Sequence, residues 1–74
     1  METWTTEPCV QFYTANYLDS KIPGKGGVKY GRRHGFCLET QHAPDAPNQP
    51  GFESVRLNPG EVFQSTTIYQ FETV

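Results

Sequence analysis

The stretch GFCLETQ, residues 35–41, decides the fold, because apolar and β-prone residues surround a single carboxylate there. Side chains in a β-strand alternate between two faces. The two faces would hold Phe36, Leu38 and Thr40 on one side, and Cys37, Glu39 and Gln41 on the other. The stretch therefore predicts a strand with one mainly apolar face and one mainly polar face.

The segments on either side of this strand have the composition of connections. Residues 19–35 contain five glycines and three lysines, which predicts a long, mobile loop. Residues 42–51 contain three prolines, too many for the hydrogen-bonded ladder of a sheet. This second segment is therefore predicted to be a loop, either ordered and extended or flexible.

The rest of the chain also favours strands. No segment shows the 3.6-residue apolar period of a helix over three turns. Alternating or β-prone runs predict strands at residues 2–6, 10–14, 54–57 and 62–71. The tetrapeptide NPGE, residues 58–61, fits a type II turn with Pro second and Gly third. The sequence predicts an all-β protein.

Length limits what these strands can build. Seventy-four residues allow one domain at most, and 14% of them are aromatic. A chain this short buries only about 60% of its unfolded surface. The free energy gained by burying apolar surface then nearly equals the conformational-entropy cost of folding, unless disulfides or a bound metal add stability. An aromatic-rich chain of this size indicates part of a β-sandwich or supersandwich rather than the whole of one.

The net charge of −2 is unevenly distributed along the chain. No acidic residue lies between Asp19 and Glu39, a region that holds five of the six basic residues. Such clustering can mark a nucleic-acid contact, but the aromatic interleaving that stacks bases is missing. A solvated basic loop is favoured, and we expect no nucleic-acid partner. Without a bilayer-length apolar run or a signal-peptide pattern, we also expect no membrane partner and a cytoplasmic location.

Metal and phosphate sites find little support. The stretch GKGG lacks the third glycine of a dinucleotide fingerprint, and no Gly-Lys-Ser/Thr follows a strand. The zinc-ligand residue types are Cys9, His34, Cys37 and His42, but the His-x-x-Cys spacing does not match a paired-ligand knuckle. We expect no metal, and a small buried thiol at Cys37. The two cysteines could form one disulfide if the fold brought them together.

Glu39 has two interpretations on pattern alone. A lone carboxylate on a strand usually faces solvent or forms a salt bridge. A catalytic base would instead need a partly apolar pocket, where desolvation raises the pKa of a carboxyl toward neutrality. The neighbouring Phe36, Cys37 and Leu38 could supply such surroundings, so both interpretations stay open at this point.

Three blocks, TTEPCVQFYTAN, GFCLETQ and PDAPNQP, occur in an order and spacing that resemble the C-terminal part of the aldose 1-epimerases, or galactose mutarotases. The resemblance extends from about Glu2 to Phe71. Cys9 stands where many relatives have glycine. The resemblance implies a large antiparallel β-supersandwich several times longer than this chain. Residues 1–74 would then be an incomplete C-terminal segment of a single domain.

The resemblance also implies an activity. These isomerases interconvert the α and β anomers of free aldohexoses such as galactose and glucose, and use no cofactor. The glutamate of the LETQ motif, here Glu39, acts as general base at the anomeric hydroxyl. The glutamine of the VQFYT motif, here Gln11, lies at the sugar. The family's acid histidine lies upstream, and neither His34 nor His42 matches its motif, so we expect the chain to be inactive alone.

Two alternatives follow from other features. The chain could be a non-catalytic product that binds sugar weakly through Gln11 and Glu39, or that pairs its exposed strand edges with another chain. It could also belong to hexose-6-phosphate epimerases of similar fold, with Arg32 and Arg33 placed for the phosphate. The blocks quoted above favour the free-sugar group. No pattern in the sequence indicates an oligomeric state.

Overall fold

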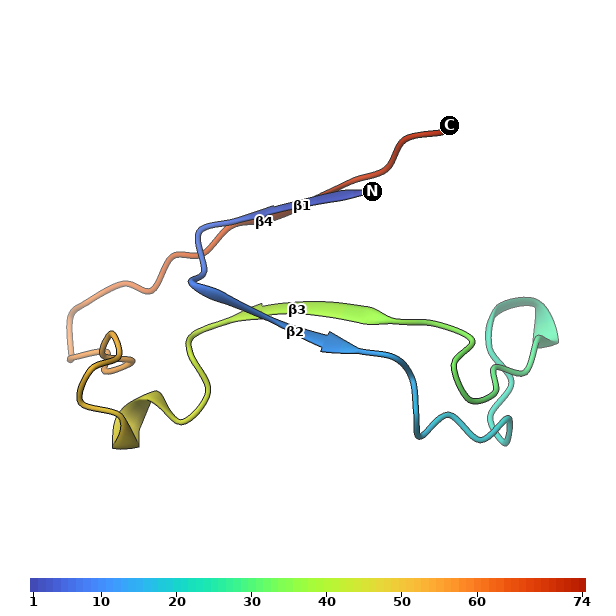
Figure 1. Cartoon of the computed structure of the whole chain (residues 1–74), viewed down its shortest axis with the longest axis horizontal. Helices are drawn as coiled ribbons and strands as arrows, with labels where there is room; N and C mark the ends of the chain where they lie inside the picture. Colours follow the sequence, from blue (N-terminus) through green and yellow to red (C-terminus); the bar gives the residue numbers. More distant parts are fainter.

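The computed structural model describes all 74 residues and consists of two separate two-stranded antiparallel sheets. Strands β1 (Glu2–Thr5) and β4 (Thr67–Gln70) form one sheet, and β2 (Cys9–Tyr13) and β3 (Cys37–Gln41) form the other. Two short 3₁₀ turns, η1 (Lys25–Gly27) and η2 (Ala46–Asn48), lie in the connections. The all-β prediction is confirmed (Figure 1). No helix is long and apolar enough to cross a membrane.

The register of the two ribbons is defined by directly opposed residues. In the β1–β4 ribbon Trp4 lies opposite Ile68, and in the β2–β3 ribbon Gln11 lies opposite Glu39. The chain leaves the first ribbon for the second at residues 6–8. Pro8 suits this position, because it has no N–H for a sheet ladder.

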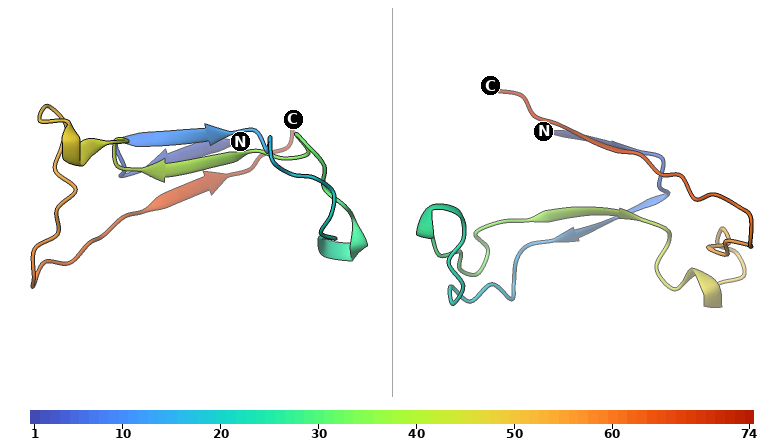
Figure 2. Two further views of the ribbon diagram at one scale, coloured as in Figure 1. Left: turned by 90° about the horizontal axis from the view of Figure 1, so that it is seen from below. Right: turned by 180° about the vertical axis from the view of Figure 1, so that it is seen from behind.

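Side chains of β3 and β4 connect the two ribbons. The Thr40 and Thr67 hydroxyls are 2.7 Å apart, and the Tyr69 hydroxyl donates to the carbonyl of Leu38 at 2.6 Å. By alternation, the face of β3 with Leu38 and Thr40 is the one turned toward β4. The ribbons meet at this end and diverge toward the chain termini, as Figure 1 and the right panel of Figure 2 show.

The Gly/Lys-rich connection has internal order. The amide of Ser20 donates to the carbonyl of Tyr30 at 3.1 Å, and that of Gly24 donates to Val28 at 2.7 Å. The Tyr30 ring lies directly over Gly24, where a Cβ would overlap it. The segment therefore folds back on itself as a narrow loop, and its mobility stays a prediction.

The proline-rich connection, residues 42–51, is a series of hydrogen-bonded turns. Asp45 takes a left-handed conformation, with φ of 60°, immediately before η2. Its carboxylate accepts hydrogen bonds from the side-chain amides of Asn48 at 2.6 Å and Gln49 at 2.8 Å. These bonds lower the pKa of Asp45, the Asn48 bond most strongly. Of the two predicted forms, the structure has the ordered one.

Two predicted strands are wrong in whole or in part. Residues 54–57 form no strand, and of residues 62–71 only Thr67–Gln70 pair. The physical reason is the lack of a partner, because β1 ends at Thr5 and the other segments have no strand beside them. The predicted turn is confirmed: the amide of Glu61 donates to Asn58 at 3.1 Å, and Gly60 has φ of 86°.

The chain has almost no core. Ala15 and Ala46 are the only buried hydrophobic residues. The radius of gyration is 16.8 Å, against about 11 Å for a compact domain of this length. The structure therefore has the small hydrophobic core that the sequence predicted, and large apolar side chains face solvent on both ribbons.

Candidate active site

Gln11 and Glu39, the two predicted site residues, occupy the centre of the β2–β3 ribbon. Each is the middle residue of its five-residue strand, and the two are register partners. Directly opposed residues of antiparallel strands place their side chains on the same face, with Cβ atoms about 4.5–5.5 Å apart. The structure thus brings together two residues that are far apart in sequence.

The face that carries this pair points away from the other ribbon. The Thr40 hydroxyl contacts β4 on the opposite face of β3, and strand side chains alternate. Gln11 and Glu39 are both exposed. The Gln11 amide nitrogen donates to the carbonyl of Phe12 at 3.1 Å, which leaves its side-chain oxygen free. Glu39 forms no salt bridge, so the solvent-facing interpretation fits this chain by itself, and both carboxylate oxygens are available to a ligand.

An apolar hollow of about 520 Å³ borders Glu39 at the free edge of β3. Its other lining residues are Met1, Phe36, Cys37, Leu38, Tyr69 and Phe71. They come from β3 and from the ends of the β1–β4 ribbon, so the hollow lies where the two ribbons diverge. Its volume is in the range of small-ligand sites. Glu39 has the one charged side chain of this lining, and apolar surroundings therefore exist on one side of it.

Comparison with known proteins identifies the family of this chain. The sequence profile of the aldose 1-epimerases matches residues 1–70. Galactose mutarotases from Homo sapiens and Bos taurus are each 54% identical over 71 residues. The aldose 1-epimerase of Escherichia coli strain K12 is 38% identical over 73 residues. This chain belongs to the aldose 1-epimerase family.

The match to these aldose 1-epimerases covers 96% of this chain but only 21% of each relative. The chain therefore spans about one fifth of the length of the curated relatives it matches. Its antiparallel all-β arrangement is consistent with part of a mutarotase-like fold.

Neither histidine lies beside the pair in this aldose 1-epimerase chain. The Nδ1 atom of His34 accepts the Gly31 amide at 3.1 Å, within the Gly/Lys-rich connection. His42 follows the last residue of β3, and its Nδ1 atom lies 3.5 Å from the Glu7 carboxylate. Three residues along a strand separate His42 from Glu39 by about 10 Å. The structure brings Gln11 to Glu39, but neither histidine.

The cysteines lie at opposite ends of the β2–β3 ribbon. Cys9 is the register partner of Gln41, and Cys37 is the partner of Tyr13. Both are free thiols, so the disulfide left open by the sequence is not formed. Cys37 is exposed, and the prediction of a buried thiol is wrong, because its face of β3 has no layer packed on it. No group of three His, Cys, Asp or Glu side chains converges as metal ligands.

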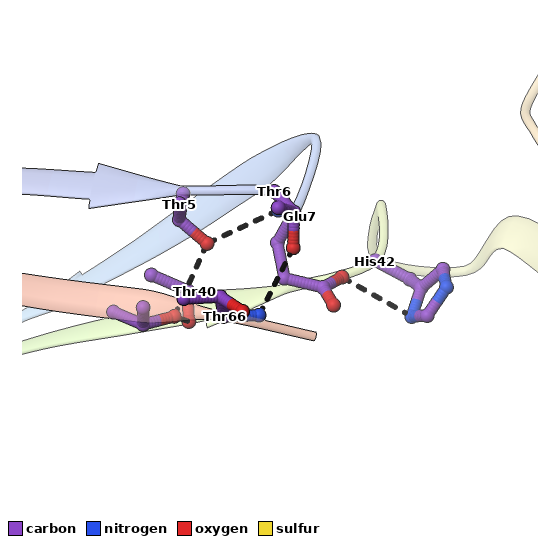
Figure 3. Close-up of polar contacts among 7 residues, drawn as sticks. Thr5, Thr6, Glu7, Thr40, His42 and Thr66 are labelled. Atoms are coloured by element: carbon purple, nitrogen blue, oxygen red, sulfur yellow. Dashed lines mark hydrogen bonds and ion pairs between the residues drawn. The ribbon is translucent and has the colours of Figure 1, made fainter. Parts of the chain in front are cut away.

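Sequence reasoning missed a polar junction next to the start of β2 and the end of β3 (Figure 3). The side chain of Glu7 is only 8% exposed and pairs with His42, which also packs on Phe63 with ring centroids 5.9 Å apart. The Thr6 hydroxyl accepts the Thr66 amide at 3.1 Å. These contacts hold the start of β2 to the end of β3 and to the approach of β4. The run of hydroxyl residues at positions 5–6 and 65–67 was the available signal.

Proposed function

We propose that this protein acts in the interconversion of the α and β anomers of free aldohexoses such as galactose and glucose. Glu39 is the general base at the anomeric hydroxyl, and Gln11 binds sugar hydroxyls. The observation that carries the proposal is the direct opposition of Gln11 and Glu39 on one open face of a strand pair. Membership of the aldose 1-epimerase family supports the choice of substrate class.

The chemistry needs only proton transfers. Glu39 takes the proton of the anomeric O1 hydroxyl, the C1–O5 bond breaks, and its electron pair leaves with O5, which gains a proton from an acid. Rotation about C1–C2 presents the other face of the aldehyde. The reverse proton transfers close the ring, so no atom is gained or lost and no cofactor is required. Gln11 offers one acceptor and two donors, which suits neighbouring sugar hydroxyls.

The acid is assigned to a residue outside these 74. Neither His34 nor His42 lies beside Glu39. A positioned base alone contributes about 10²- to 10⁴-fold, and Glu39 is exposed in this chain. We therefore expect the chain alone to be inactive, and residues 1–74 to act as the C-terminal segment of one aldose 1-epimerase domain. The cytoplasmic location stays a prediction from the sequence.

A graft tests the base. This chain would replace the matched 71 residues of human galactose mutarotase, giving what is called here the grafted enzyme. Polarimetry of α-galactose would measure its rate. We expect Glu39→Gln to lower kcat by about 10²-fold or more, because the base is lost while the shape is kept. Glu53→Gln, an exposed carboxylate outside both ribbons, is the matched control. An unchanged rate in the Glu39→Gln enzyme would refute the assignment of the base.

Sugar binding without catalysis is the second candidate, and the exposure of Gln11 and Glu39 favours it. A ¹H–¹⁵N spectrum of the 74-residue chain titrated with galactose addresses it directly. Saturable shifts at both residues without mutarotation would support binding alone. Activity of the grafted enzyme on glucose 6-phosphate but not on galactose would favour the phosphosugar alternative, which relies on Arg32 and Arg33.

A further inference from the structure

The face of the β2–β3 ribbon that carries Gln11 and Glu39 is here called the site face. Directly opposed residues share a face, and every second residue along a strand returns to it. A sugar bound at Gln11 and Glu39 extends beyond them to one side, so the neighbouring rows are the nearest groups to the rest of its ring. The site face contains three rows of register partners: Cys9 with Gln41, Gln11 with Glu39, and Tyr13 with Cys37.

The open space beside Glu39 lies on the side of the Tyr13 row. The apolar hollow that borders Glu39 is lined on β3 by residues 36–38, and Gln41 is not among its lining residues. Cys37, in the middle of that lining, is the register partner of Tyr13. A sugar held at Glu39 by its anomeric hydroxyl therefore extends toward Tyr13 and away from Gln41.

Tyr13 is held in place at the end of the ribbon. It is the last residue of β2, where the chain leaves for the long connection to β3 (Figure 1). Its hydroxyl oxygen accepts the amide of Tyr17 at 3.1 Å, and the two rings stack with centroids 6.5 Å apart and planes 16° from parallel. A side chain fixed in this way loses little rotamer freedom on binding a ligand. The oxygen serves the Tyr17 amide only as acceptor, so its own O–H remains free to donate.

We propose that Tyr13 is a sugar-contacting residue of the site and that its O–H donates to a hydroxyl at the far end of the aldohexose, on C4 or C6. Tyr13 and Glu39 occupy diagonal positions of the strand pair, whose Cβ atoms are about 7–8 Å apart. With Glu39 at O1, this separation places the phenol beside C4, across the ring from C1, and its neighbours. Galactose and glucose differ at C4, so Tyr13 contributes to the choice between them. The inference rests on the proposed function for the position of O1.

Kinetics of the grafted enzyme test this contact, with galactose, 4-deoxygalactose and 6-deoxygalactose as substrates. We expect Tyr13→Phe to lower kcat/KM for galactose by about 5- to 10-fold, because one neutral hydrogen bond to the substrate is lost. The loss should disappear with the deoxy sugar that lacks the contacted hydroxyl, which a merely structural role of the phenol would not produce. Tyr30→Phe, the same change on a ring outside both ribbons, is the matched control. Gln41→Ala tests the opposite row and should affect all three sugars equally.

Sugar affinity separates this contact from the proposed chemistry. It is measured by titration of the grafted enzyme carrying Glu39→Gln and of the 74-residue chain, each with and without Tyr13→Phe. Weaker galactose binding in Tyr13→Phe, with no such difference for one deoxy sugar, supports the contact even if the Glu39→Gln enzyme keeps its mutarotation rate and the base is refuted. Equal losses with all three sugars, no loss with galactose, a sugar-dependent loss in Gln41→Ala instead, or no galactose binding by either protein would overturn it.

Discussion

The two ribbons are similar in length but differ in how the chain closes them. Residues 14–36 join the ends of β2 and β3 and carry hydrogen bonds of their own. The β1–β4 ribbon is instead formed by strands from the two ends of the chain. The segment that closes it is much longer, because the facing residues Thr5 and Thr67 are 62 positions apart. The longer closure costs roughly 0.8 kcal/mol more in loop entropy. The candidate catalytic pair therefore lies on the ribbon whose connecting segment, residues 14–36, is held by its own hydrogen bonds.

The β1–β4 ribbon depends on contacts with the other ribbon to make up that difference. Thr67 is the central group, because its hydroxyl lies 3.1 Å from that of Thr5 and 2.7 Å from that of Thr40. One contact is within the ribbon and the other reaches β3. The β1–β4 ribbon is therefore stabilised through the ribbon that carries the candidate site, and the stabilities of the two ribbons should be coupled.

Removal of the Thr67 hydroxyl should give the largest stability change. Thr67→Val keeps the side-chain shape and deletes both hydroxyl contacts, so we expect a loss of about 1–3 kcal/mol. Urea unfolding of the grafted enzyme would measure it. Thr3→Val is the matched control on the same face, because the Thr3 hydroxyl oxygen is buried without a partner. That variant should be neutral or slightly more stable. Equal losses in both variants would contradict the role given to Thr67.

The connection that closes the β2–β3 ribbon is tested at Gly24. In Gly24→Ala the added methyl group would overlap the Tyr30 ring, which must move. We expect a loss of about 1 kcal/mol, because overpacking is partly relieved by a half-exposed ring. Gly35→Ala, with no neighbouring atom within 4 Å, should be neutral or slightly stabilising. Amide exchange of Ser20 and Gly27, whose N–H groups donate to the carbonyls of Tyr30 and Gly24, should quicken only in the first variant; unaltered exchange would mean that this packing does not hold the loop.

Much of the fold was predictable because it is local. The alternation over 35–41 predicted the strand that the structure has at Cys37–Gln41, and residues 58–61 predicted a turn that forms. Residues 62–66 alternate equally well and form no strand. Alternation reports which face a side chain would occupy, whereas pairing depends on whether a second strand lies alongside, and that is a property of distant residues.

The candidate site was predictable in part for the same reason. Glu39 and Gln11 were identified through the family motifs, yet their opposition depends on the β2–β3 register, which neither motif contains. The Glu7–His42 pair was missed because the two residues are far apart in sequence and each resembles an ordinary surface charge. Residue type indicated the chemistry, and only the fold indicated which groups meet.

Acid titration distinguishes the two connections and should give the smallest effect. Lys21, 3.0 Å away, lowers the pKa of Asp19 through its ammonium, whereas the neutral amides of Asn48 and Gln49 lower that of Asp45. Both contributions to stability are present above an ordinary aspartate pKa of about 3.9 and are lost as pH falls through the lowered values. In 1 M salt the Asp19 shift should shrink while the Asp45 shift persists, because screening acts on the ion pair. Carboxyl ¹³C titration by NMR measures both, with Lys21→Met as the control for Asp19. Equal salt dependence at the two residues would mean that charge, and not amide hydrogen bonding, also holds the proline-rich turn.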